Sequence, residues 1–318
     1  MSTPFIGHDR QISYINKIRS RGRMAHAYLF HGPEHLGKLT LALMLAQSFF
    51  CPQSTKTDIR SVCGTCASCQ AIVNRRFPHV IFLDTHHTLV SKKETRKEIP
   101  IEDIRELKRI FSLRPAGETW RLAIIDEADK MSEEAVNAFL KLLEEPGPQT
   151  LIILIAPSRD LLLPTILSRT QVVGFFPVPE LKLRAFMETK DITAKMQDEL
   201  LVLAGGRPGI LMRVCSDSAY AQQERGFADE IEHIIFDRDI LNALRLSEKI
   251  APDQALREKT VGWIISFLRR QLIAELGASS DKLVKKIKRI DRIAMLLETT
   301  NANPRLGMDV IFLESMAI

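Results

Sequence analysis

Four cysteines lie in one short stretch with the spacing of a metal site. They are Cys51, Cys63, Cys66 and Cys69, which gives the pattern C-x11-C-x2-C-x2-C. Closely spaced thiolates bind zinc with tetrahedral geometry, and four protein ligands leave no open position for water. The spacing therefore predicts a structural Zn²⁺ site. An iron–sulfur cluster and a redox pair are the alternatives for the same cysteines.

A second group of residues has the composition of a phosphate-binding loop. It contains Gly32, Gly37 and Lys38, followed by Leu39 and Thr40. Glycines let the backbone wrap around a phosphate, the start of a helix offers unpaired N–H groups, and a lysine reaches the outer phosphates. The full motif, G-x-x-x-x-G-K-[ST], has a hydroxyl directly after the lysine as a ligand for magnesium. The sequence predicts such a loop; a simple turn of the chain is the alternative.

Leu39 stands where the magnesium-binding hydroxyl belongs. Thr40 comes one residue later and points about 100° further around the helix, so it is a poor substitute. Without this ligand, magnesium is badly placed for phosphoryl transfer. We expect an impaired nucleotide site that does not hydrolyse ATP. Whether ATP and Mg²⁺ bind there is left open by the sequence.

Two acidic residues end an apolar segment further along the chain. Asp126 and Glu127 follow the sequence Arg-Leu-Ala-Ile-Ile. In active nucleotide hydrolases such an aspartate helps to hold magnesium, and the adjacent acid orients the attacking water. Acids at strand ends also serve as helix caps, but the phosphate loop upstream favours a nucleotide site.

The segments that must position these residues alternate between strand-like and helical patterns up to residue 175. Near-continuous apolar runs, typical of strands buried on both faces, cover 28–31, 80–84, 122–126, 151–156 and 172–175. Apolar residues recur at helical spacing over 101–111 and again after Ser132. We predict Ser132 to be the N-cap of the second of these helices. This alternation predicts an α/β fold with a parallel sheet covered by helices.

After residue 176 the strand-like runs largely disappear. Pro177 and Pro179 mark a linker, Gly-Gly-Arg-Pro-Gly interrupts the helical pattern at 205–209, and the longest helical segment covers 255–276. A final helix opens at Asn303-Pro304, where proline fits a first turn. We predict an α/β domain over 1–175 with a zinc module over 51–70, a small helical lid over 176–213 and a larger all-α domain over 214–318.

The composition excludes several classes of protein. Hydrophobic residues make up 45% of the chain and charged residues 26%, as in soluble globular proteins. No apolar run approaches the roughly 20 residues that span a bilayer, and the first residues lack the apolar core of a signal peptide. We therefore expect a cytoplasmic protein with reduced thiols and no membrane contact. The net charge of +5 permits contact with nucleic acid but does not establish it.

Several motifs resemble the AAA+ clamp-loader family of DNA polymerase III. They are DEADKM at 126–131, NAFLKLLEEP at 137–146, LPTILSRT at 163–170 (similar to the S-R-C motif), the cysteine cluster, GGR at 205–207 and NANPRL at 301–306. The resemblance covers nearly the whole chain. It implies an AAA+ P-loop parallel sheet with a zinc-binding insertion, a small helical lid and an all-α C-terminal collar that mediates oligomerisation.

The resemblance implies roles for two arginines. The arginine of the S-R-C motif is an arginine finger that acts in trans at the ATP site of a neighbouring subunit, and Arg169 occupies its place. A guanidinium suits this role because it is permanently charged and forks onto phosphate oxygens. Without the resemblance, Arg169 would be interpreted as a residue that caps the next turn. Arg207 matches the lid arginine loosely, because Pro208 follows it.

The resemblance also implies partners. Motor subunits of the family have an intact G-K-[ST], whereas Leu39 places this chain with the member that completes the ring without turning over ATP. The implied function is to help load the sliding clamp onto primed DNA within a hetero-pentamer. The implied partners are gamma/tau motor subunits, the delta subunit, the sliding clamp and the backbone of primer–template DNA. A motor ATPase of this family and a zinc-dependent DNA-binding protein with a vestigial P-loop are the alternatives.

Overall fold

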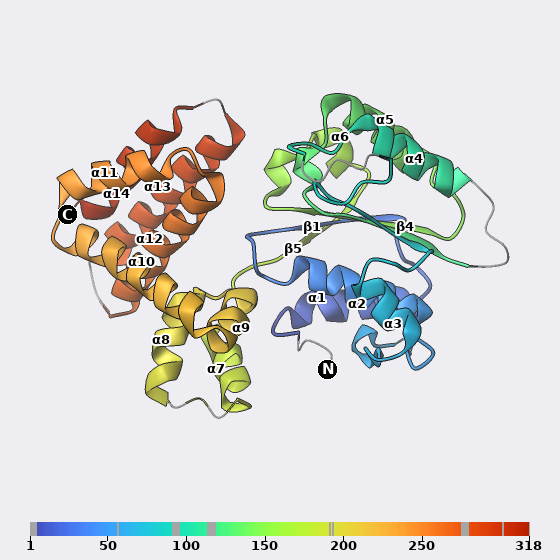
Figure 1. The fold of residues 1–318 in the computed structure, drawn as a ribbon, viewed down its shortest axis with the longest axis horizontal. Helices are drawn as coiled ribbons and strands as arrows, with labels where there is room; N and C mark the ends of the chain where they lie inside the picture. The colour runs from blue at the N-terminus through green and yellow to red at the C-terminus, as the bar shows by residue number, and fades with distance from the viewer. Residues whose placement is uncertain are drawn as a thin grey trace. The chain divides into compact units, whose positions relative to one another are not determined.

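The chain folds into two compact units, Met1–Lys182 and Leu183–Ile318 (Figure 1). The computed structural model describes residues 5–55, 57–90, 96–112, 119–190, 192, 194–274, 280–300 and 302–317. Within these ranges, no helix has the length and apolar composition of a bilayer-spanning segment.

A parallel sheet forms the centre of the first unit (Figure 1). Its strands are β1 (Ala27–His31), β2 (Val80–Leu83), β3 (Arg121–Ile125), β4 (Thr150–Ala156) and β5 (Gln171–Gly174). The order is β2-β3-β4-β1-β5, and every neighbouring pair is parallel. Every residue of the central strand β4 is buried, which explains its continuous apolar sequence. The five predicted strands and the α/β fold are confirmed.

Helices cover both faces of this sheet. They are α1 (Asp9–Ser20), α2 (Lys38–Phe50), α3 (Ala67–Val73), α4 (Ile101–Ser112), α5 (Glu133–Glu144) and α6 (Pro164–Leu167), with short 3-10 turns η1 (Ile59–Ser61), η2 (Ala128–Lys130) and η3 (Arg159–Leu161). Because strand side chains alternate, Tyr28 and Phe30 enter one core cluster while Ala27 and Leu29 enter the other. The predicted N-cap of α5 is confirmed, since Ser132 Oγ accepts from the backbone N–H of Ala135 at 3.2 Å.

The segment after β5 stays with the first unit. Val178 is buried, and a Cβ added at Gly7 would lie 2.6 Å from its side chain. This contact joins the segment after β5 to the start of the chain, within the unit Met1–Lys182. Pro177 and Pro179 lie outside any helix or strand, and the predicted domain boundary at 175/176 stays a prediction.

The described part of the second unit is helical. Starting just before the unit boundary, the helices are α7 (Glu180–Glu188), α8 (Ala194–Ala204), α9 (Pro208–Ser216), α10 (Ser218–Phe236), α11 (Ile240–Ile250), α12 (Gln254–Ala274), α13 (Ser280–Thr299) and α14 (Pro304–Met316). The predicted start of α14 is confirmed, because Asn303 Oδ1 accepts from the N–H of Arg305 at 3.0 Å. Residues 275, 276 and 301 of the predicted segments lie outside the described residues. The division into a lid over 176–213 and a collar over 214–318 stays a prediction.

Candidate functional site

The predicted phosphate loop connects β1 to α2. Gly32 has φ 141° and Gly37 has φ 91°, in the region of backbone space that favours glycine. At Gly32 a side chain is also excluded by space, since a Cβ would lie 2.2 Å from the carbonyl oxygen of Phe175. Gly37 directly precedes Lys38, the first residue of α2. The loop therefore needs both glycines and leads into the N–H groups at the start of a helix.

Lys38 is buried beneath the loop. Its ammonium group donates to the carbonyl oxygen of Gly32 and, at 2.8 Å, to that of Pro33. These carbonyls are neutral acceptors, so a phosphate oxygen would be a stronger partner for the same charge. The next residue, Leu39, packs against the core cluster beneath α2, and Thr40 is half-buried on the same helix. An aliphatic side chain offers magnesium no oxygen ligand, but the behaviour of the loop toward a nucleotide stays a prediction.

A buried histidine that the sequence did not single out supports the loop. Nε2 of His8 lies 2.9 Å from the carbonyl oxygen of Leu36, and its ring centroid lies 4.8 Å from that of Phe175. Burial lowers the pKa of His8, which favours a neutral ring whose N–H donates to the carbonyl. His8 thus ties the segment before α1 to the loop.

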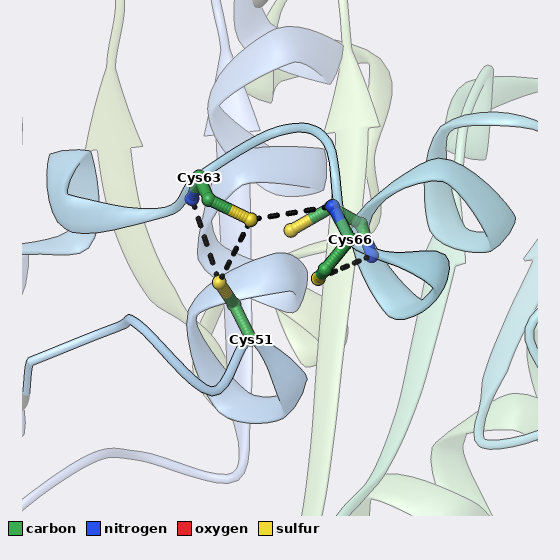
Figure 2. Close-up of side chains that lie close together, drawn as sticks. Cys51, Cys63 and Cys66 are labelled. Atoms are coloured by element: carbon green, nitrogen blue, oxygen red, sulfur yellow. Dashed lines mark hydrogen bonds between the residues drawn. The ribbon is translucent and has the colours of Figure 1, made fainter.

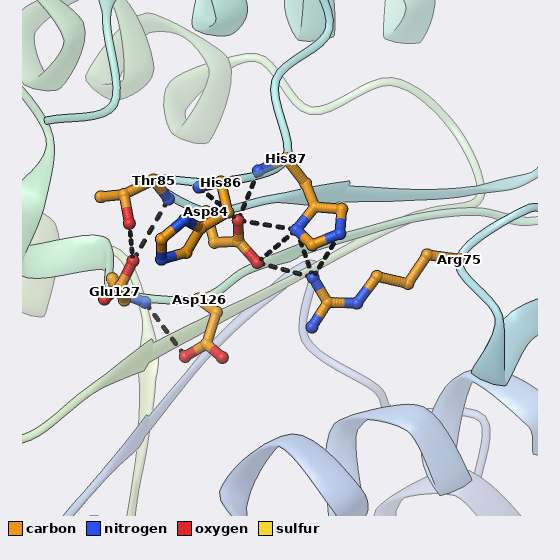
Figure 3. Close-up of polar contacts among 7 residues, drawn as sticks. All are labelled: Arg75, Asp84, Thr85, His86, His87, Asp126 and Glu127. Carbon is orange, nitrogen blue, oxygen red and sulfur yellow. Dashed lines mark hydrogen bonds and ion pairs between the residues drawn. The ribbon is translucent and has the colours of Figure 1, made fainter. Parts of the chain in front are cut away.

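Asp126 directly follows β3, at the end of an apolar strand (Figure 3). Its carboxylate accepts from the backbone N–H of Glu127 at 3.0 Å. Burial raises the pKa of Asp126, and the positive charge of Lys38 partly opposes this shift. The charges of the loop lysine and of this acid therefore influence one another, and the roles of both residues in binding a nucleotide stay predictions.

Glu127 is held by neighbouring donors, of which Figure 3 shows Thr85. Its carboxylate accepts from the N–H of Thr85 at 3.2 Å, from the hydroxyl of Thr85 and from Lys130 Nζ at 2.6 Å. Burial alone would raise the pKa of Glu127, but the hydrogen bonds from Lys130 and Thr85 outweigh it and lower the pKa. The carboxylate is thus ionised and restrained by these donors, and its role at a nucleotide site stays a prediction.

The four predicted metal ligands lie together, and Figure 2 labels three of them, Cys51, Cys63 and Cys66. The Sγ atoms of Cys51, Cys63, Cys66 and Cys69 are all within 4.8 Å of one another, and those of Cys51 and Cys63 are 3.6 Å apart. A tetrahedron with Zn–S bonds of about 2.3 Å has S–S edges of about 3.8 Å, whereas a disulfide measures about 2.05 Å. The donor set and its spacing therefore fit a tetrahedral metal ion such as zinc. The grouping of the four cysteines is confirmed.

The cysteine cluster joins two helices. Cys51 caps the end of α2, and Cys66 caps the start of α3, where its sulfur accepts from the N–H of Cys69 at 3.5 Å. Hydrogen bonds from the backbone N–H groups of Thr65 and Cys66 lower the pKa of Cys63 to about 6. A metal ion binds the thiolate form, so these donors favour binding. In contrast, burial raises the pKa of the Cys69 thiol, which a metal must therefore deprotonate.

Arg169 lies at the surface of the first unit, in the turn after α6. Its guanidinium donates to Glu144 Oε1 at 2.9 Å and to the carbonyl oxygen of Thr165 at 3.1 Å. The side chain of Arg169 is 36% exposed and that of Glu144 is 52% exposed. An exposed pair of this kind contributes little stability, so another anion can compete for the arginine. Its role as an arginine finger stays a prediction.

Arg207 belongs to the second unit and starts α9. Its Nε donates to the carbonyl oxygen of Ala204 at 3.5 Å, and its guanidinium lies against Gly262 of α12, where an added Cβ would be 3.6 Å away. This arginine therefore packs within the helical unit. Its role as a lid arginine stays a prediction.

The sequence of the first unit matches a known protein family. A family model described as "DNA polymerase III, delta subunit" matches residues 7–179, which is more than half of the chain. The chain belongs to this family. A delta' subunit of DNA polymerase III from Bacillus subtilis (strain 168) is 32% identical over 176 residues, which cover 55% of this chain and 50% of that protein.

Two further relatives place the match within DNA polymerase III. A delta' subunit from Pseudomonas aeruginosa is 28% identical over 263 residues, which cover 81% of this chain and 76% of that protein. DNA polymerase III subunit tau from Escherichia coli (strain K12) is 33% identical over 166 residues, which cover 52% of this chain and 24% of that protein. The predicted membership of the clamp-loader family, with a delta'-type assignment, is confirmed by the family model and the two delta' relatives.

In this family member, a cluster that the sequence did not predict surrounds Asp84 at the end of β2 (Figure 3). Its carboxylate accepts from the backbone N–H groups of His86 at 2.8 Å and His87 at 2.5 Å, and from the guanidinium of Arg75 at 2.6 Å. Burial alone would raise the pKa of Asp84, but the hydrogen bonds from His87 and Arg75 outweigh it and lower the pKa. One sequence signal was available, because Asp84 ends an apolar strand as Asp126 does.

Arg75 connects this cluster to the cysteine segment. Arg75 follows α3 and has φ 57°. Its backbone N–H donates to the carbonyl oxygen of Ile72 at 3.0 Å, and the N–H of Arg76 donates to the carbonyl oxygen of Ala71 at 2.8 Å. This pair of bonds is a Schellman motif, whose left-handed position usually holds glycine. In this chain an arginine occupies that position. Here it carries the only guanidinium bonded to Asp84 among the described residues.

We expect Arg75→Ala to lower the free energy of unfolding by about 1–3 kcal/mol at neutral pH, because it leaves the buried carboxylate of Asp84 without its arginine partner. The pKa of Asp84 is lowered in the folded chain, so its charge stabilises the fold above the unfolded pKa. This stabilisation is lost as the pH falls through the pKa that Asp84 has in the folded chain. The difference between wild type and variant should therefore shrink below about pH 4.

Urea unfolding from pH 7 downward measures this effect. The matched control is Arg76→Ala, which removes an exposed arginine from the next position and should change stability by less than about 0.5 kcal/mol. Equal stability of Arg75→Ala and wild type at pH 7 would show that the contact with Asp84 contributes nothing.

Proposed function

We propose that this chain is the stator-like delta' subunit of a bacterial clamp loader, which helps to place the sliding clamp on primed DNA without hydrolysing ATP itself. The observation that carries the proposal is the phosphate loop in which Lys38 is followed by Leu39, in a member of this family. The loop keeps the glycines and the lysine that bind phosphate but lacks the hydroxyl that magnesium needs. The restrained carboxylate of Glu127 supports the same interpretation.

Arg169 is proposed to act in trans as the arginine finger of a neighbouring motor subunit. Its guanidinium is at the surface and is paired with an exposed carboxylate, so a partner's phosphate can replace Glu144. Phosphate oxygens accept two parallel N–H bonds from a guanidinium, which a lysine cannot offer. The finger would therefore stabilise charge that develops during hydrolysis at the neighbour's site.

The proposed partners are gamma/tau motor subunits, the delta subunit, the sliding clamp and primer–template DNA, within a cytoplasmic hetero-pentamer at the replication fork. The relation to a protein named subunit tau supports a shared assembly. The helical second unit is proposed to contain the lid and the oligomerising collar. The four-cysteine cluster is proposed to hold a structural Zn²⁺ that joins α2 to α3.

Assembly tests the proposal most directly. The purified chain should form a stable pentamer with motor subunits and a delta subunit, as seen by gel filtration and mass measurement. Failure to join these subunits, together with tight sequence-specific DNA binding by the chain alone, would favour a zinc-dependent DNA-binding protein instead.

The isolated chain should show no ATP hydrolysis above background, even if it binds nucleotide weakly, because Leu39 removes the magnesium ligand. Steady-state phosphate release measures this, with Lys38→Ala as the matched control for contaminating activity. Turnover that is present in the wild-type chain and absent in Lys38→Ala would contradict the proposal and favour a motor ATPase.

A further inference from the structure

Helix α13, labelled in Figure 1, has two chemically opposite faces. Its apolar residues Leu283, Ile287 and Ile290 are buried, with no more than 8% of each exposed. They recur at helical spacing and pack this helix into the unit. The opposite side is therefore fixed in position and faces away from the unit's core.

Five basic residues occupy this outer side. They are Lys282, Lys285, Lys288, Arg289 and Arg292, and all five are exposed. At about 100° per residue they fall within a sector of about 120°, which we call the basic face of α13. The sector contains one acidic residue, Asp281, in the first helical turn.

The charges of the basic face are largely unbalanced. Arg289 forms an ion pair with Glu314 at 3.0 Å, but the other four residues have no ion-pair partner in the described part of the chain. Several of them are also three or four positions apart, and like charges at this spacing destabilise a helix. Helix α11 differs, because its exposed Arg245 and Lys249 are interspersed with Glu248.

We propose that the basic face of α13 binds the phosphate backbone of nucleic acid without sequence preference. Its residues extend over about 15 Å at 1.5 Å per residue. Along that length a DNA duplex carries about nine phosphate charges, at one per 1.7 Å. Flexible lysines can follow such a row of charges, and the release of condensed counterions drives the association.

An acidic protein surface is the other occupant that the charge would allow, but the composition of the face disfavours it. Stable protein interfaces have an apolar or aromatic centre and are depleted in lysine. Between Lys282 and Arg292 the basic face contains no apolar side chain and three lysines. This composition is typical of a contact with phosphates rather than of a protein interface.

The inference deepens the proposed function, on which it rests for DNA as the relevant nucleic acid. It does not involve the phosphate loop or Arg169. If the loader assembles and turns over ATP normally while substitutions in α13 leave DNA binding unchanged, this inference alone is overturned. The proposed function then stays intact.

The test compares two double variants of the full-length chain. Lys285→Ala with Arg292→Ala removes two charges from the basic face, and Arg245→Ala with Lys249→Ala removes one lysine and one arginine from α11. All four residues are exposed and alanine favours helix, so circular dichroism should show both variants folded. Fluorescence anisotropy with a short labelled duplex of arbitrary sequence then gives affinity as a function of salt concentration.

At about 50 mM salt, each lost phosphate contact should weaken binding roughly tenfold. The reason is that the logarithm of the binding constant falls with the logarithm of the salt concentration with a slope of about −0.9 per contact. The α13 variant should therefore bind about 100-fold more weakly than wild type, and the magnitude of its log–log salt slope should fall by about two. The α11 variant should bind as wild type does. Equal weakening in both variants, or no binding by wild type at low salt, would overturn the proposal. Binding of an acidic polyglutamate peptide without binding of the duplex would indicate a protein partner instead and overturn it as well.

Discussion

Replacing Arg169 by alanine should slow ATP turnover by the assembled loader while leaving assembly intact. The arginine is at the surface and contacts Glu144 and Thr165, so its loss removes no core packing. Arginine fingers increase the rate at one site by about 10³-fold or more. The decrease in bulk turnover should be smaller, because other subunits of the ring have fingers of their own.

Steady-state ATP hydrolysis by reconstituted complexes, with clamp and primed DNA present, measures this effect. Two variants separate the finger from its surroundings. Glu144→Gln breaks the ion pair but keeps the guanidinium, so it should retain wild-type turnover. Arg21→Ala removes another exposed arginine of the same unit and should also retain wild-type ATP turnover. Wild-type turnover in a correctly assembled Arg169→Ala complex would show that Arg169 is only a structural residue.

Loss of the metal should be the most damaging single change to the first unit. The purified chain is expected to contain about one equivalent of zinc, as one four-thiolate site requires. Cys66→Ser removes a ligand that also caps α3, so zinc content should fall to background. Structural zinc contributes directly to folding, and a loss of about 4 kcal/mol would lower the melting temperature by roughly 10 °C in a unit of this size.

Metal analysis and calorimetry test this together. Cys215→Ser is the matched control, because Cys215 is half-buried and lies outside the cluster. It should keep its zinc and nearly all of its stability. Iron with visible absorption in the wild-type chain, or an unchanged zinc content in Cys66→Ser, would overturn the zinc assignment.

The sequence by itself determined the features that depend on neighbouring residues. The strands were predictable because a strand buried on both faces needs an uninterrupted apolar run, and β4 shows this at every position. The cap at Ser132 was predictable for a similar reason, because its partner Ala135 is three residues away. The cysteine cluster combines short spacing with a chemistry that few other arrangements share, so four residues were enough to predict it.

The tertiary structure alone decided which distant side chains meet. Glu127 is restrained by Thr85, and Arg169 is paired with Glu144, because parallel strands and packed helices bring separate segments together. The bond between Arg75 and Asp84 follows the same rule, although only nine positions separate them. An arginine in a left-handed turn and an acid at a strand end each have many possible partners. The geometry of the turn after α3 and the end of β2 selects one of them, and no local pattern of residues encodes that choice.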